Sequence, residues 1–128
     1  MTPRFIERVG SIYRVLKEMD AGCWVISYSD PAAPHFLSDE NLRHFQRIPA
    51  PDTFQPQERN EMTPAQRNRL ALIQPLLDNP ACMTDKTVRT GIAADISADG
   101  ATTVRRILQM YYRFLATGRI TSVRNRSM

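Results

Sequence analysis

The sequence is poor in the residues on which most metal-binding and catalytic motifs depend. Its 128 residues include only two cysteines and two histidines. Cys23 and Cys82 lie far apart without a CxxC partner, which argues against a zinc finger or a disulfide framework. His35 and His44 add no metal-ligand spacing, and the sequence contains neither a Ser/His/Asp set nor a phosphate-binding glycine loop. It therefore predicts no enzyme activity, no metal and no cofactor.

Long hydrophobic runs are also absent. No apolar stretch approaches the roughly 20 residues that a membrane-spanning helix requires, and Met1–Arg4 does not begin a signal peptide. We therefore expect a cytoplasmic protein that makes no membrane contact. The length predicts one small domain or two very small ones, each with a modest core.

Acidic side chains are scarce in the C-terminal third. The chain carries a formal charge of +4, yet residues 84–128 alone hold eight basic and three acidic side chains, a net +5. Residues 1–47 hold six of each sign. A basic segment attracts an anionic partner, and nucleic acid is the commonest large one.

The N-terminal part has the composition of a small sheet. Short runs rich in Val, Ile, Phe and Tyr alternate with turn residues and predict strands at residues 4–9, 12–18, 23–28 and 35–37. Ser38 has the character of an N-cap for a short helix that ends near Gln46. We expect a small sheet or partial barrel over residues 1–47, followed by a proline-rich linker at residues 48–62.

Residues 63–128 predict a bundle of three helices with a basic tail. Thr63, Pro64 and Gln66 form a capping box with proline at the first helical position. This helix covers Pro64–Leu77, and Pro75 is expected to kink it or end it. Thr84 is expected to cap a second helix over about residues 85–96. A third helix covers about residues 101–117 and stops at Gly118.

The second and third helices are predicted to form a helix-turn-helix, because only Ser97–Asp99 separates them. Small Ala94 is placed where the helices approach closely, and Ala98 takes the place of the glycine that such turns often contain. The predicted fold class is therefore α+β, with a small β-rich N-terminal subdomain followed by a tri-helical helix-turn-helix bundle.

The third helix has two distinct faces when it is plotted at 100° per residue. Its apolar stripe consists of Val104, Ile107, Leu108, Tyr111 and Leu115. The opposite face carries Thr102, Arg106, Gln109 and Arg113, with Arg105 beside it, and no acidic residue. In a recognition helix, arginine pairs with guanine, glutamine pairs with adenine, and threonine contacts phosphate or a thymine methyl group.

This pattern assigns two sets of DNA-binding residues. Those predicted to reach base edges are Thr102, Thr103, Arg105, Arg106, Gln109 and Arg113. Those predicted to neutralise phosphates, a contribution independent of sequence, are Lys86, Arg89, Arg119, Arg124 and Arg126. No coiled-coil heptad is present, so we expect a monomer.

The order of these parts resembles the N-terminal region of TnsB-like transposase subunits, which are relatives of the phage Mu transposase. The β-rich part is similar to the family's "G…YRVL…WV" pattern at Gly10–Leu16, Cys23–Ile26 and Phe36–Leu42. The helical part is similar to the family's "ILP.I…TV.R.L..Y…G" pattern at Leu72–Leu77, Thr103–Leu108, Tyr112 and Gly118. The resemblance covers about residues 5–118.

The resemblance implies sequence-specific binding of double-stranded DNA at transposon ends. In that family a later RNase H-like domain carries out DNA recombination, and no residues after Gly118 could supply it. The resemblance thus implies a DNA-binding fragment or truncated protein, with other transposition proteins as further partners. Two alternatives remain open, a protein-interaction adaptor and a small transcriptional regulator.

Overall fold

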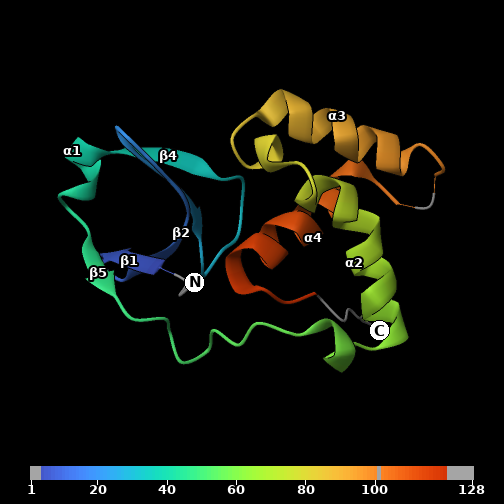
Figure 1. Cartoon of the computed structure of the whole chain (residues 1–128), viewed down its shortest axis with the longest axis horizontal. Coiled ribbons are helices and arrows are strands. Elements are labelled where there is room, and N and C mark those ends of the chain that lie inside the picture. Colours follow the sequence, from blue (N-terminus) through green and yellow to red (C-terminus); the bar gives the residue numbers. More distant parts are fainter. Residues whose placement is uncertain (1–3, 101, 121–128) are drawn as a thin grey trace.

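The computed structural model describes residues 4–100 and 102–120 and contains an antiparallel sheet followed by helices (Figure 1). This arrangement is compatible with the predicted α+β class. The sheet contains five strands in the order β4-β3-β2-β1-β5. They are β1 (Arg4–Arg8), β2 (Ser11–Met19), β3 (Gly22–Ser27), β4 (His35–Ser38) and β5 (Gln46–Ile48).

The helix predicted after Ser38 is shorter than expected, and the strand β5 follows it. The predicted helix ending near Gln46 is wrong, because α1 (Asp39–Leu42) forms a single turn and buries no residue. Ser38 does cap α1, its side chain accepting a hydrogen bond from the Asn41 amide. Beyond this turn, Gln46–Ile48 pairs antiparallel with β1 and covers its open edge. An edge strand with unpaired backbone groups favours such pairing.

The two faces of the sheet are both covered, but by different parts of the chain. One face buries Ile6, Cys23 and Val25 beneath side chains of the N-terminal part itself. On the other face Phe5, Arg14 and Ile26 lie in register on neighbouring strands. Phe5 and Ile26 are fully buried there. The second face therefore faces the linker and the helical part.

The helical part consists of α2 (Pro64–Leu77), α3 (Lys86–Ser97) and α4 (Val104–Thr117), with one-turn 3-10 helices η1 (Arg59–Glu61) and η2 (Pro80–Met83). The capping box of α2 is confirmed: the Thr63 hydroxyl accepts from the Gln66 amide, and the Gln66 side chain accepts from the Thr63 amide. Pro75 lies inside α2, which continues to Leu77. The three helices share one core, whose fully buried members include Ile73, Leu76, Ala93 and Ile107.

The connection between α3 and α4 differs from the prediction. It comprises residues 98–103, whereas the sequence predicted the three-residue turn Ser97–Asp99. The start of α4 moves because Thr103 is its N-cap, with a hydroxyl that accepts from the Arg106 amide. The small residue between the helices is fully buried Ala93, and Ala94 is exposed. Asp85 rather than Thr84 caps α3, because its carboxylate accepts from two amides of the first turn.

Figure 1 shows α4 between the sheet and the other two long helices, and α4 contacts both β2 and β3. Arg14 joins these parts, since its Nη1 donates to the Leu115 carbonyl at 2.8 Å and its guanidinium lies over the Phe54 ring. Burial lowers the pKa of Arg14. The Phe54 ring also packs edge-on against Phe5. The segment 48–62 is therefore held against both parts that it connects.

Candidate functional site

Helix α4 presents a polar face to solvent because its apolar residues recur with the helical period. Ile107 and Tyr111 are buried in the helical core, as the sequence predicted. Arg105, Arg106, Gln109 and Arg113 are exposed. The side chains of the last three make no hydrogen bond or ion pair within residues 4–100 and 102–120. Three polar side chains on successive turns are thus available to a ligand.

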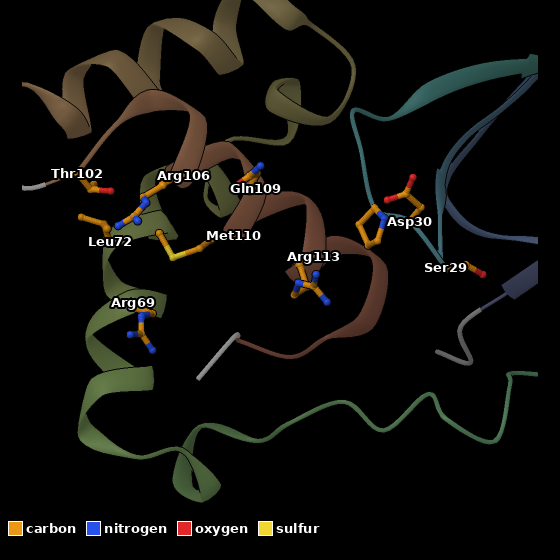
Figure 2. A pocket seen from close by; sticks show the side chains of 10 residues that line it. Ser29, Asp30, Arg69, Leu72, Thr102, Arg106, Gln109, Met110 and Arg113 are labelled. Atoms are coloured by element: carbon orange, nitrogen blue, oxygen red, sulfur yellow. The ribbon is translucent and has the colours of Figure 1, made fainter. Parts of the chain in front are cut away.

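This face lines a cavity of about 660 Å³. Figure 2 shows α4 along one side with Thr102, Arg106, Gln109, Met110 and Arg113. Helix α2 contributes Arg69 and Leu72, and the loop between β3 and β4 contributes Ser29, Asp30 and Pro31. The cavity therefore combines residues of α2, of α4 and of the β3–β4 loop, which are distant from one another in the sequence.

The charge in the cavity is strongly uneven. Among the described residues, its charged lining consists of the guanidinium groups of Arg69, Arg106 and Arg113 and the carboxylate of Asp30. Charges of one sign held close together repel one another, and an anionic ligand would relieve that repulsion. The arrangement can therefore bind an anion through charge-assisted hydrogen bonds.

A second cavity of about 340 Å³ shares Arg113 with the first. Its other lining residues are Tyr28, Thr53, Gln66, Thr117, Arg119 and Ile120. Arg119 is exposed and one of its nitrogens donates to the Gln55 carbonyl at 2.8 Å. The remaining donors of this guanidinium extend the basic surface from α4 to the linker.

The structure brings together four of the six residues that the sequence assigned to base edges. Thr102, Arg106, Gln109 and Arg113 line one cavity. Arg105 is exposed but does not line it, and the Thr103 hydroxyl is occupied in capping α4. The helical period placed the four cavity residues on one side of α4. It did not predict the capping role of Thr103, because that role depends on where α4 begins.

The phosphate-contacting assignment of Arg89 needs correction. Arg89 is only 4% exposed, and its Nη1 donates to the Cys82 carbonyl at 3.0 Å. Its guanidinium lies over the Tyr112 ring, 5.5 Å from the centroid. The position falls on the inner side of α3, where the aliphatic stem packs with the core, so the charge does not reach a phosphate.

The other predicted phosphate contacts lie in different places. Lys86 is exposed in the first turn of α3. Arg124 and Arg126 fall outside the described residues. The described part of the chain contains no cluster of three or more His, Cys, Asp or Glu side chains that could hold a metal ion. Nor does it contain a helix that combines the length and apolar character needed to cross a membrane.

Burial also shapes the titration of two groups behind the site. It raises the pKa of Tyr111 and of the Cys82 thiol, both of which lie in the helical core beside Arg89. Both side chains therefore stay neutral at physiological pH. The core next to α4 thus has Arg89 as its only buried charged side chain among the described residues.

Sequence reasoning missed the parts of the cavity that α4 does not supply. Arg69 lies on α2 at a position that the helical period places beside Leu72 and Ile73. Asp30 lies in the loop between two predicted strands, where no site residue was predicted. The position of an arginine beside apolar residues of α2 was the signal that the sequence offered. The approach of the β3–β4 loop to α4 depends on tertiary packing alone.

Comparison with known proteins adds no family. No protein-family model matches the sequence. A search of curated proteins found no match either.

Proposed function

We propose that this protein binds double-stranded DNA in a sequence-specific manner through the outer face of α4. The observation that carries the proposal is the row of exposed side chains of Arg106, Gln109 and Arg113, which are unpaired within the described residues and have no acid on their own helix. Arginine and glutamine have the donor and acceptor geometry that the major groove distinguishes. Phosphate oxygens supply the anion that the basic cavity favours.

In this proposal α4 acts as the recognition helix and α3 as the helix that supports it. Arg106, Gln109 and Arg113 contact base edges, while Arg119 and Lys86 contact phosphates. The six-residue connection between the helices is longer than the turn of a compact helix-turn-helix. The proposal therefore rests on the face of α4 and not on the turn.

The more specific proposal is that the DNA is a transposon end, recognised by the N-terminal region of a transposase without its catalytic domain. Its support is the sequence resemblance to TnsB-like transposase subunits. Arg14, which belongs to the matching segment Gly10–Leu16, holds the sheet on the C-terminal turn of α4. In such a protein the role of the β-rich part would be to position the recognition helix.

The proposal is tested by selecting duplexes from a pool with a randomised core and measuring their electrophoretic shift at several salt concentrations. Arg106→Ala should weaken binding to the selected duplex by about 1–3 kcal/mol and affect a scrambled duplex much less. Arg119→Ala should weaken both duplexes alike and lower the salt slope by about one. Arg43→Ala, an exposed arginine outside both cavities, serves as the matched control.

Equal weakening of both duplexes by Arg106→Ala would mean that α4 lies along phosphates without reading bases. If the parent protein shifts no duplex even at low salt, DNA binding is wrong. The adaptor alternative would then stand, and one observation favours it: Met19 and Phe36 are large apolar side chains that remain 46% and 38% exposed on the sheet.

A further inference from the structure

The β3–β4 loop places a carboxylate where a purely phosphate-binding surface would exclude one. Asp30 lines the same cavity as Arg69, Arg106 and Arg113. Figure 2 shows it across the cavity from Arg106, with Gln109 between them in this view. A carboxylate repels phosphate, so its presence weakens nonspecific binding of a polyanion.

The Asp30 carboxylate is also free to accept hydrogen bonds. Within residues 4–100 and 102–120 its side chain has no hydrogen-bond or ion-pair partner, and only its backbone amide is used, donating to the Ser27 hydroxyl at 3.2 Å. Arg106 and Arg113 are likewise unpaired although they line the same cavity. A carboxylate that served only to balance these arginines would pair with one of them.

We infer that the β3–β4 loop is a second base-reading element, in which Asp30 accepts a hydrogen bond from the exocyclic amino group of a base, cytosine N4 first. This inference rests on the proposed function and names a specificity-determining residue for it. Acidic side chains accept from cytosine N4 in the major groove, whereas a glutamine pairs with adenine. Asp30 on the loop and Gln109 on α4 would therefore recognise different bases from within one cavity.

The division of charge within the cavity supports this role. The arginines can contact phosphates or guanine, and both are acceptors. Asp30 can only accept, so it selects a part of the ligand that carries amino hydrogens and no negative charge. Polynucleotides present both kinds of group, with phosphate oxygens along the backbone and exocyclic amino groups on the base edges of the major groove.

The test uses the full chain and a pool of duplexes with a randomised core. The parent, Asp30→Asn and Asp30→Ala are each taken through the same selection, and their enriched sequences are compared. Glu40→Gln, which removes an equal charge from an exposed position on α1, is the control. Circular dichroism melting confirms that each variant is folded.

We expect the parent to enrich a motif with C·G preferred at one position. Asp30→Ala should abolish the preference at that position, with about a tenfold loss of discrimination against the other pairs, while the remaining positions stay unchanged. It should also bind scrambled duplex more tightly, because a repulsive charge is removed. Glu40→Gln should retain the full motif.

Other outcomes separate the inference from the proposed function. If both Asp30 variants enrich the parent motif unchanged, the carboxylate only moderates the charge and the inference is wrong, although DNA binding stands. If the parent enriches no motif, or binds only single-stranded oligonucleotides of the same sequence, the proposed function fails and the inference fails with it.

Discussion

Arginines that look alike in the sequence take opposite roles at the scale of single residues. Arg106 and Arg113 are exposed and have no side-chain partner in the part of the chain that the structure describes, so they remain available to a ligand. Arg89 and Arg14 instead donate to backbone carbonyls of η2 and α4 and lie over aromatic rings. Burial rather than charge determines which arginines hold the fold together.

The burial of Arg89 leads to a prediction about stability. Arg89→Ala should lower the free energy of unfolding by about 2–3 kcal/mol, because it removes buried packing and the hydrogen bond to the Cys82 carbonyl. Urea denaturation measures this loss. Exposed Arg43→Ala should change the same quantity by less than about 0.5 kcal/mol. If Arg89→Ala keeps its stability but binds DNA more weakly, the structural role of Arg89 is wrong and the predicted phosphate contact stands.

At the scale of elements, the two ends of α4 are fixed by different interactions. Thr103 caps its first turn with a side-chain oxygen. Gly118 ends it in the left-handed region with φ +72°, and the Gly118 amide donates to the Phe114 carbonyl. A Cβ at Gly118 would lie 2.9 Å from the Cβ of Pro56 in the linker. The C-terminus of α4 is thus shaped for close contact with the linker.

Two glycine substitutions test this account. Gly118→Ala should destabilise the protein by about 1–2 kcal/mol, because alanine is strained at positive φ and would collide with Pro56. Gly91→Ala, inside α3 with no atom near the added Cβ, should stabilise it by about 0.5–1 kcal/mol. Thermal melting of the two variants measures both effects. A stabilising Gly118→Ala would contradict the close approach of linker and helix.

At the scale of the whole molecule, a few residues join the helical part, the linker and the sheet. Besides the Arg14 bond to Leu115, the Gln57 amide donates to the Gly118 carbonyl at 2.9 Å. The Phe54 ring fills the space above Phe5 and Tyr28. These contacts hold the linker against both the sheet and the C-terminal end of α4.

Limited proteolysis tests how strongly these contacts hold the linker. Trypsin should cleave the parent first between Ile48 and Met62, where Arg59 is exposed, while both flanking parts stay protected. Arg14→Met should accelerate this cleavage several-fold, because it removes the hydrogen bond and the charge over the Phe54 ring. Arg8→Met, an exposed arginine of β1, should be cleaved at the parent rate.

Mass spectrometry of the first fragments identifies the cut. Earliest cleavage within residues 4–47 or 63–100 would contradict the division into two parts. An unchanged rate in Arg14→Met would show that this arginine does not join them.

The sequence by itself determined the elements whose signals are local. The capping box at Thr63–Gln66, the glycine stop at Gly118 and the two faces of α4 follow from neighbouring residues and the helical period. The strands β1 to β4 were likewise readable from alternation and turns. The strand β5 was not, because a three-residue segment becomes a strand only when β1 offers it an open edge.

Only the tertiary structure decided which polar residues share a site. Asp30, Arg69 and Arg106 belong to three separate elements, and their meeting depends on how α4 packs between the sheet and α2. The same packing buried Arg89. Helical periodicity assigns a residue to a face of its helix. Which neighbour covers that face depends on contacts distant in sequence, and no local pattern encodes them.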